Sequence, residues 1–225
     1  MLCRPERVRE LFRALHDFKS QTKLSNIKAI GAKIRLGMTE KQHKRDKVYL
    51  PVAELAGQYL DYLTVHPRHA GLRVCDQEPD LDALREIKSS APPNLVVIGN
   101  ADVTSRASFE HMTKATGCDA VMVARGAIHN PWMFRHLLDP GKHTEWPSLP
   151  EVDKAEAASI EWERRWAEAN GGHIKNKYVT FRQVNFQRIR HFVKTGEMLV
   201  TGNKWAREMK DEHLRKHKGR RVKGS

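Results

Sequence analysis

The sequence predicts an α/β fold, in which a parallel sheet is followed by an all-α C-terminal unit. Short runs of β-branched and apolar residues alternate with segments whose apolar residues recur at helical spacing. The expected strands start about 25 to 35 residues apart, a length that fits one strand, one helix and their loops. Because strands joined by crossover helices pair side by side in one direction, the sheet is expected to be parallel.

The expected elements follow one another in a regular order. Strands are expected at residues 29–36, 62–65, 94–98 and 120–123. Helices are expected at 6–18, 52–59 and 81–87, from a cap at Thr104 or Ser105 through 116, and from 130–134 onward. Polar or small residues follow each strand, at 35–37, 66–69, 99–102 and 124–127. Ligands bind α/β proteins at the carboxyl ends of strands, so these loops are expected to converge on one site.

The C-terminal part reads as successive helices, at 150–169, 181–194 and 203–217. Residues 173–225 hold 15 lysines and arginines against four acids, a net charge of +11, whereas the whole chain carries +13. Residues 1–172 are therefore nearly neutral. We divide the chain into a body (1–140), a helical unit (141–214) and a basic tail (215–225), with the positive charge concentrated after residue 172. A solubilising arm explains the basic tail as well as a nucleic-acid contact does.

Composition narrows the class of protein further. With 40% hydrophobic and 30% charged residues, the 225-residue chain can form a core, which excludes disorder throughout. The positive charge makes nucleic acid the first partner to test. Three cysteines without C-x-x-C spacing indicate neither a disulfide framework nor a zinc site, and no metal site is expected. No membrane span or signal peptide is visible, so we expect a soluble, cytoplasmic protein.

Aromatic and basic residues are interleaved before the tail. The aromatic residues are Tyr178, Phe181, Phe186, Phe192 and Trp205. At helical spacing we assign most of them to the core and the neighbouring cations to RNA. The expected RNA-binding residues are Lys175, Lys177, Arg182, Arg188 and Arg190.

Four motifs carry a resemblance to a known family. They are A-K-I-R-L-G at 32–37, T-V-H-P-R at 64–68, V-I-G-N-A-D at 97–102, and T-G-C-D-A-V-M-V-A-R-G-A-I-H-N-P-W-M-F at 116–134. With them the chain resembles the tRNA-dihydrouridine synthases, flavin enzymes that reduce uridine in tRNA. The resemblance implies a partial TIM (β/α)8 barrel, about strands 5 to 8, followed by a helical tRNA-binding unit. It also implies FMN as cofactor, NADPH as reductant and tRNA as partner.

Matched motif by motif, the resemblance assigns cofactor-binding residues. Lys33 and His66 match positions that contact the flavin, and the remaining matches hold its phosphate: Asn100, Ala101, Asp102, Ala124 and Arg125. A fixed cation near the ring suits the charge of reduced flavin, and Arg125 suits a phosphate. The family usually has glycine where Pro67, Ala101 and Ala124 stand, and Ala101 is expected to crowd a phosphate.

The front of the family's barrel is not recognised in the chain. Residues 1–8 resemble the stretch that follows the family's catalytic loop, so strands one to four and the catalytic cysteine are expected to precede residue 1. No catalytic role is assigned to Cys3, Cys75 or Cys118, and Cys118 is interpreted as a small buried residue. We therefore expect the chain alone to retain little FMN and to be inactive, unless a partner chain or an N-terminal segment completes the barrel.

Two other interpretations stay open. The chain is also consistent with a non-catalytic RNA-binding protein derived from this family, which keeps the basic helices and a scaffold. A different flavin- or phosphate-binding barrel enzyme is the third interpretation, and the basic helical end argues against it.

Overall fold

A computed structural model of the chain describes residues 3–21, 27–71, 77–172 and 176–197. The chain divides into two compact units, Met1–Glu145 and Trp146–Ser225, which we call the α/β unit and the C-terminal unit. The expected division lay at residue 140. The expected helix at 203–217 and the tail at 215–225 lie outside the described residues.

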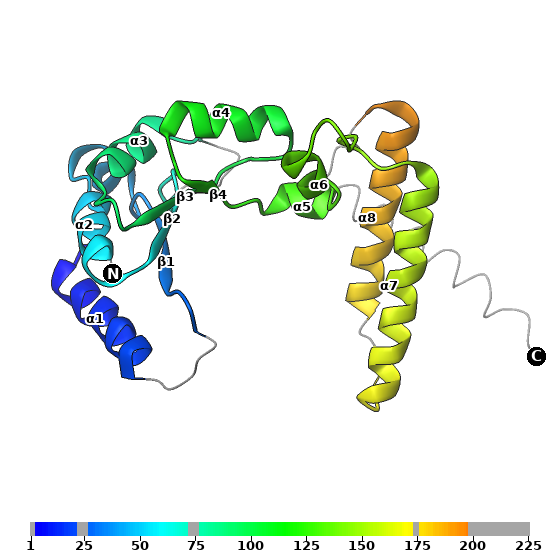
Figure 1. Cartoon of the computed structure of the whole chain (residues 1–225), viewed down its shortest axis with the longest axis horizontal. Helices are drawn as coiled ribbons and strands as arrows, with labels where there is room; N and C mark the ends of the chain where they lie inside the picture. The colour runs from blue at the N-terminus through cyan, green and yellow to red at the C-terminus, as the bar shows by residue number, and fades with distance from the viewer. Residues whose placement is uncertain (1–2, 22–26, 72–76, 173–175, 198–225) are drawn as a thin grey trace, which may run out of the picture. The chain divides into compact units, whose positions relative to one another are not determined.

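The α/β unit is built on a four-stranded parallel sheet (Figure 1). Its strands are β1 (Gly31–Arg35), β2 (Tyr62–His66), β3 (Val96–Gly99) and β4 (Ala120–Val121), paired in the order β1-β2-β3-β4. Each pair is parallel, so the chain crosses back between consecutive strands. The α/β class, the parallel sheet and the four strands expected from the sequence are confirmed, and β4 is shorter than expected.

Helices lie before, between and after the strands. The structure has α1 (Pro5–Gln21), α2 (Tyr49–Tyr59), α3 (Leu81–Ser90), α4 (Arg106–Thr116), α5 (Arg125–His129) and α6 (Met133–Leu138), and a π-helical turn η1 (Lys41–Arg45). Ser105 caps α4 by accepting the Ser108 amide, as its sequence position predicted. Asp80 caps α3 in the same way through the Ala83 amide at 2.9 Å. The sequence did not predict η1 or α5.

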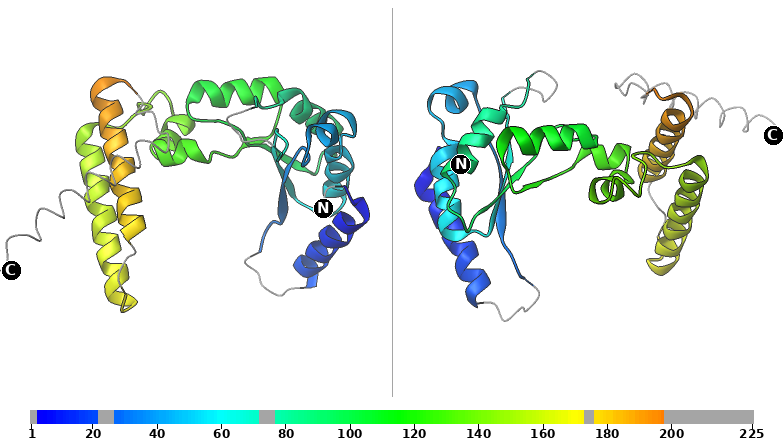
Figure 2. Two further views of the ribbon diagram at one scale, coloured as in Figure 1. Left: turned by 180° about the vertical axis from the view of Figure 1, so that it is seen from behind. Right: turned by 45° about the horizontal axis from the view of Figure 1, so that its top comes forward.

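One face of the sheet packs against helices, and there the main core lies. Ile34 on β1, Leu63 and Val65 on β2 and Val97 on β3 point to this face, because the register pairs Ile34 with Val65 and Leu63 with Val97. The same core includes apolar side chains of α1, α2 and α3, and those helices are seen beside the sheet in Figures 1 and 2. Leu63, Val65 and Val97 are fully buried. Burial of these side chains is the main force holding the unit together.

The other face, which we call the second face, carries different residues. Lys33 lies opposite Thr64 and Arg35 opposite His66, so these polar groups share one side of the sheet. On the same side Val96 of β3 is 43% exposed, and Met122, the residue that follows β4, is 37% exposed. Apolar side chains that remain exposed on a strand are unusual for a parallel sheet, whose two faces are normally both covered.

A smaller apolar cluster supports the loops after β3 and β4. Ala101, Val103, Met112, Cys118 and Met133 are buried together in it. Cys118 is 7% exposed, which agrees with its interpretation as a small buried residue, whereas Cys3 is exposed. Cys75 lies outside the described residues. The cluster gives the loop that follows β3 a fixed base.

In the C-terminal unit the described residues form two helices, α7 (Leu149–Ala169) and α8 (Asn176–Thr195). Trp146, just before α7, stacks on Phe192 of α8 with ring centroids 3.8 Å apart. Val152 and Ile189 are buried. Phe192 therefore packs within the unit, as expected for most of these aromatics. No helix of the described segments has the length and apolar character needed to cross a membrane.

Neighbouring valines on β3 test which face carries the core. Val97→Ala should lower the free energy of unfolding by about 2 to 3 kcal/mol, because it removes buried methyl groups and leaves a cavity. The control Val96→Ala alters the second face and should cost less than about 0.5 kcal/mol. Urea denaturation followed by circular dichroism measures both. Equal losses would contradict the assignment of the two faces.

Candidate ligand-binding site

A cavity of about 330 Å³ lies at the carboxyl ends of β2, β3 and β4. The last residue of β2, the loops after β3 and β4, and α5 line it: His66, Asn100, Ala101, Asp102, Val103, Thr104, Met122, Ala124, Arg125, Gly126 and His129. Six of the seven residues expected to bind a cofactor are among them. The loops therefore converge as the sequence predicted, at the position where α/β proteins bind ligands.

Asn100 joins the two loops that form the cavity. Its backbone amide donates to the Val65 carbonyl at 3.0 Å, and its side-chain amide donates to the Met122 carbonyl at 2.8 Å. The Met122 amide in turn donates to the Gly99 carbonyl at 2.8 Å. Because Asn100 is 7% exposed, these bonds continue the pairing of the sheet beyond the last residues of the strands.

Asp102 lies between two arginines. Arg68, whose side chain is 3% exposed, donates from Nη2 to Asp102 Oδ2, and Arg125 donates from Nη2 to Oδ1 at 2.5 Å. Asp102 has a backbone φ of +42°, a left-handed conformation that aspartate tolerates better than most residues. Partial burial opposes ionisation, but the hydrogen bond and charge of Arg68, with those of Arg125, lower the pKa of Asp102.

His66 is kept neutral by its surroundings. Burial lowers its pKa to about 4, and the positive charges of Arg35, Lys33 and Arg68 act in the same direction. The Arg68 guanidinium approaches its ring, with Nη1 3.4 Å from His66 Nε2. At neutral pH the imidazole thus offers one N–H donor and one acceptor nitrogen, and carries no charge.

Lys33 is the one expected cofactor residue that does not line the cavity. It projects from β1 onto the second face, opposite Thr64, and its side chain is exposed. Partial burial of its side chain lowers the pKa of Lys33, and the positive charge of Arg35 lowers it further. The Thr64 hydroxyl is buried and has no hydrogen-bond partner among the described residues. The second face therefore carries an exposed cation, Lys33, near His66, whereas the Thr64 hydroxyl is buried within the unit.

Small residues set the spacing of the cavity walls. A Cβ at Gly126 would stand 2.2 Å from the Val103 carbonyl oxygen and 3.0 Å from Thr104 Cα, so only glycine lets α5 lie this close. Ala101 is buried in the apolar cluster at 7% exposure. Ala101 also lines the cavity, so the expected crowding of a phosphate by this alanine stays a prediction. Ala124 immediately precedes α5 and lines the cavity.

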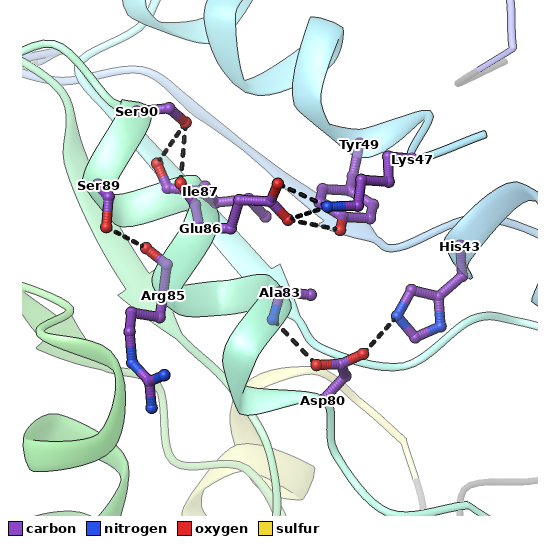
Figure 3. Close-up of polar contacts among 10 residues, drawn as sticks. All are labelled: His43, Lys47, Tyr49, Asp80, Ala83, Arg85, Glu86, Ile87, Ser89 and Ser90. Carbon is purple, nitrogen blue, oxygen red and sulfur yellow. Dashed lines mark hydrogen bonds and ion pairs between the residues drawn. The ribbon is translucent and has the colours of Figure 1, made fainter. Parts of the chain in front are cut away.

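A second polar cluster fastens the segment after β1 to α3 (Figure 3). His43 Nε2 lies 2.9 Å from Asp80 Oδ2, and burial lowers the pKa of His43. The Lys47 ammonium donates to Glu86 at 2.7 and 2.8 Å, and the Tyr49 hydroxyl donates to the same carboxylate at 3.2 Å. Burial and the neighbouring Glu86 raise the pKa of Tyr49. The cluster ties η1 and α2 to α3 by charge and hydrogen bonds.

The expected RNA-binding residues lie on or near α8. Lys175 is outside the described residues, and the side chain of Lys177 is not described. Arg182 pairs with Glu163 at 2.9 Å and Glu156 at 3.4 Å.

The next two arginines of α8 also have contacts within the C-terminal unit. Arg190 pairs with Asp153 at 2.7 Å and with Glu156 at 2.5 Å. Arg188 donates to Asn185 at 3.4 Å, and burial lowers its pKa. Arg182 and Arg190 therefore help to hold α8 against α7 (Figure 1).

Sequence reasoning did not single out Arg68 and Gly126, although both stand inside motifs that it identified. Arg68 is part of the T-V-H-P-R motif, and Gly126 is part of the A-R-G-A turn. Their roles depend on contacts with Asp102 and Val103, which lie more than twenty residues away in the sequence. The described residues contain no group of three or more His, Cys, Asp or Glu side chains able to hold a metal ion.

This geometry defines an α/β protein with a ligand cavity at the carboxyl ends of parallel strands, equipped with arginine, amide and neutral imidazole groups. The family model described as dihydrouridine synthase (Dus) matches residues 4–218. The chain belongs to the dihydrouridine synthase family, and the family expected from the four motifs is confirmed.

Curated relatives agree with this family. The tRNA-dihydrouridine synthase B of Klebsiella pneumoniae is 31% identical over 155 residues, which cover 66% of this chain and 46% of the relative. The protein of the same name from Escherichia coli (strain K12) gives the same values. That of Pasteurella multocida (strain Pm70) is 29% identical over 131 residues, covering 56% of this chain and 38% of the relative. The chain spans about half the length of the curated relatives it matches.

Titration of His66 tests the electrostatics of the cavity. We expect its imidazole NMR signals to titrate near pH 4, because burial and three nearby cations disfavour protonation. The native chain then binds fewer protons than the unfolded chain between pH 6.5 and about 4, so folding stability falls as pH is lowered through this window. A His66→Gln control should lose less stability there. A midpoint near 6.5 would refute the assignment.

Proposed function

We propose that this chain forms the flavin-phosphate side of an FMN-dependent tRNA-dihydrouridine synthase, which reduces uridine in tRNA with NADPH as reductant. The observation that carries the proposal is the convergence of Asn100, Asp102, Ala124 and Arg125 with His66 on one cavity. The names of the curated relatives support the tRNA substrate. On this proposal the protein is an oxidoreductase of tRNA processing.

The cavity fits the phosphate end of FMN. Its volume of about 330 Å³ is at the lower end of the range for ligand pockets. Arg125 provides a guanidinium that can bind a phosphate through two parallel hydrogen bonds, and its side chain is 63% exposed. Arg125 and the neighbouring residues of the cavity would hold the phosphate of the cofactor.

The chain's own residues prepare the second face for the flavin ring and the substrate. When bound, FMN supplies the hydride that reduces the uracil ring. Neutral His66 can donate one hydrogen bond and accept another without adding charge. Lys33 on β1, two residues before the partner of His66, provides a cation that suits the negative charge of reduced flavin. The general acid is not assigned to any residue of this chain.

A complete site needs further structure on the second face. The exposure of Val96 and Met122 supports a covering element there. We propose that β1 to β4 correspond to strands 5 to 8 of a TIM (β/α)8 barrel. An N-terminal segment or a partner chain would then supply the remaining strands.

The C-terminal unit is proposed to bind tRNA through its positive charge. Residues 173–225 carry a net charge of +11, which favours phosphate contacts. The residues that we propose to contact RNA are Lys175, Lys177, Arg182, Arg188 and Arg190. The same charge supports the alternative function, a non-catalytic RNA-binding protein derived from the family. Retention of FMN by the completed barrel distinguishes the two functions.

Flavin content tests the cofactor proposal. The chain purified alone should retain much less than one equivalent of FMN, because the second face is left exposed. Co-expression with the part of the E. coli relative that lies outside the match should restore flavin absorbance. Arg125→Ala should then lower FMN retention, whereas Arg85→Ala on α3 serves as a matched control and should not. Full retention by the Arg125 variant would refute the phosphate assignment.

Filter binding at several salt concentrations tests the RNA proposal. The affinity of the full chain for tRNA should fall steeply with salt, because each phosphate contact releases counterions. Lys194 lies in the last turn of α8 and is exposed. Lys194→Gln should weaken tRNA binding and reduce the slope of log affinity against log salt by about one. It should leave the melting temperature unchanged, because the side chain is exposed. Arg190→Gln should lower the melting temperature, because it removes the ion pairs to Asp153 and Glu156. Salt-independent binding, or none at low salt, would contradict the proposal.

A further inference from the structure

The two arginines that share Asp102 differ in their freedom to move. The Arg68 side chain is 3% exposed, and its Nε also donates to the Gln77 carbonyl at 2.7 Å. The Arg125 side chain is 63% exposed, and its Nη2 donates to Asp102 Oδ1 at 2.5 Å. Breaking the buried pair would leave a desolvated charge, whereas an exposed pair contributes little net stability. Arg125 is therefore the member of this cluster that can change partner.

Asp102 already fills the position that an anionic ligand would take on Arg125. A carboxylate and a phosphate both bind the planar edge of a guanidinium through charge-assisted hydrogen bonds. The carboxylate lies on the wall of the cavity, 2.5 Å from Arg125 Nη2. With one carboxylate against two guanidinium groups, the cluster keeps one excess positive charge. A second anion with more than one negative charge can thus compete for Arg125.

We propose that Asp102 is an internal counter-ion of the cavity, which holds Arg125 until the phosphate group of a ligand replaces the carboxylate. Arg68 is the positioning residue, because it keeps Asp102 in place after Arg125 has moved. The exchange favours a phosphate monoester, whose double charge outcompetes a single carboxylate. Ligands without such a group gain nothing from Arg125. This inference rests on the proposed function in one respect, since the phosphate of FMN is the expected occupant.

Inorganic phosphate tests the exchange directly in the full chain, because every residue involved belongs to it. In a titration of isotope-labelled protein at slightly alkaline pH, the Arg125 Nε–Hε signal and the Asp102 side-chain carboxyl signal should shift together, with one midpoint. This measurement needs no variant. A shift of Arg125 without Asp102, or of neither, would overturn the proposal.

Removal of the internal counter-ion should raise the affinity of the cavity for phosphate. Asp102→Asn keeps the shape of the side chain, and asparagine tolerates the left-handed backbone at this position. We expect about three- to tenfold tighter binding of inorganic phosphate, after allowing for the solvent exposure of the pair. Asp82→Asn, which removes the exposed partner of Arg85 on α3, is the matched control and should change nothing. Unchanged or weaker binding by Asp102→Asn would overturn the proposal.

Two flavins separate this inference from the proposed function. In the completed barrel, FMN should bind more tightly than riboflavin, which lacks the phosphate, and Asp102→Asn should widen the difference. Equal binding of the two flavins would refute the cofactor assignment, while the response to inorganic phosphate would still support the exchange. Preference for FMN with no effect of Asp102→Asn would refute the exchange and keep the cofactor.

Discussion

The parallel register of the four strands is the constraint on which the α/β unit depends. It sends Leu63, Val65 and Val97 to the helix-covered face and places Lys33, Arg35 and His66 on the other. It also brings the loops after β2, β3 and β4 to one edge. A shift of one residue would exchange the two faces and bury the cations in the core. The same pairing therefore produces both the stability of the unit and its cavity.

The electrostatics of the cavity depend on burial and on the positive side chains that the register brings near His66. Burial lowers the pKa of His66, and the charges of Arg35, Lys33 and Arg68 lower it further. Asp102 offsets part of the positive charge by pairing with two guanidinium groups. An anion that enters the cavity therefore meets a prepared charge distribution and a neutral imidazole. In the C-terminal unit, by contrast, acids of α7 already bind Arg182 and Arg190. Those two cations stabilise the helix pair as well as adding to the positive charge of the unit.

Much of the α/β fold could be predicted because its signals are local. Runs such as residues 94–98 combine β-branched residues with turn signals, and Ser105 is a strong cap, so strands and helices were found close to their observed positions. The cavity was predicted because loops that follow parallel strands must meet at one edge. The turns η1 and α5 were missed, since both are only five residues long and lack the periodicity that identifies longer helices.

The sequence could not predict the contacts at the site that join residues far apart in the chain. Nothing near Arg68 shows that its side chain is buried against Asp102, or that Gly126 touches the Val103 carbonyl. Likewise, the sequence of α8 does not show that acids of α7 pair with Arg182 and Arg190. Contacts between residues far apart in the sequence depend on the complete fold.

A crystal structure of the completed barrel grown with FMN tests the central claim most directly. The account predicts phosphate density within hydrogen-bonding distance of Arg125, against the loop of Asn100 to Asp102, with the ring extending over the second face beside His66 and Lys33. Flavin density at another site, such as the cavity lined by His16, Lys19 and Asp61, would contradict it.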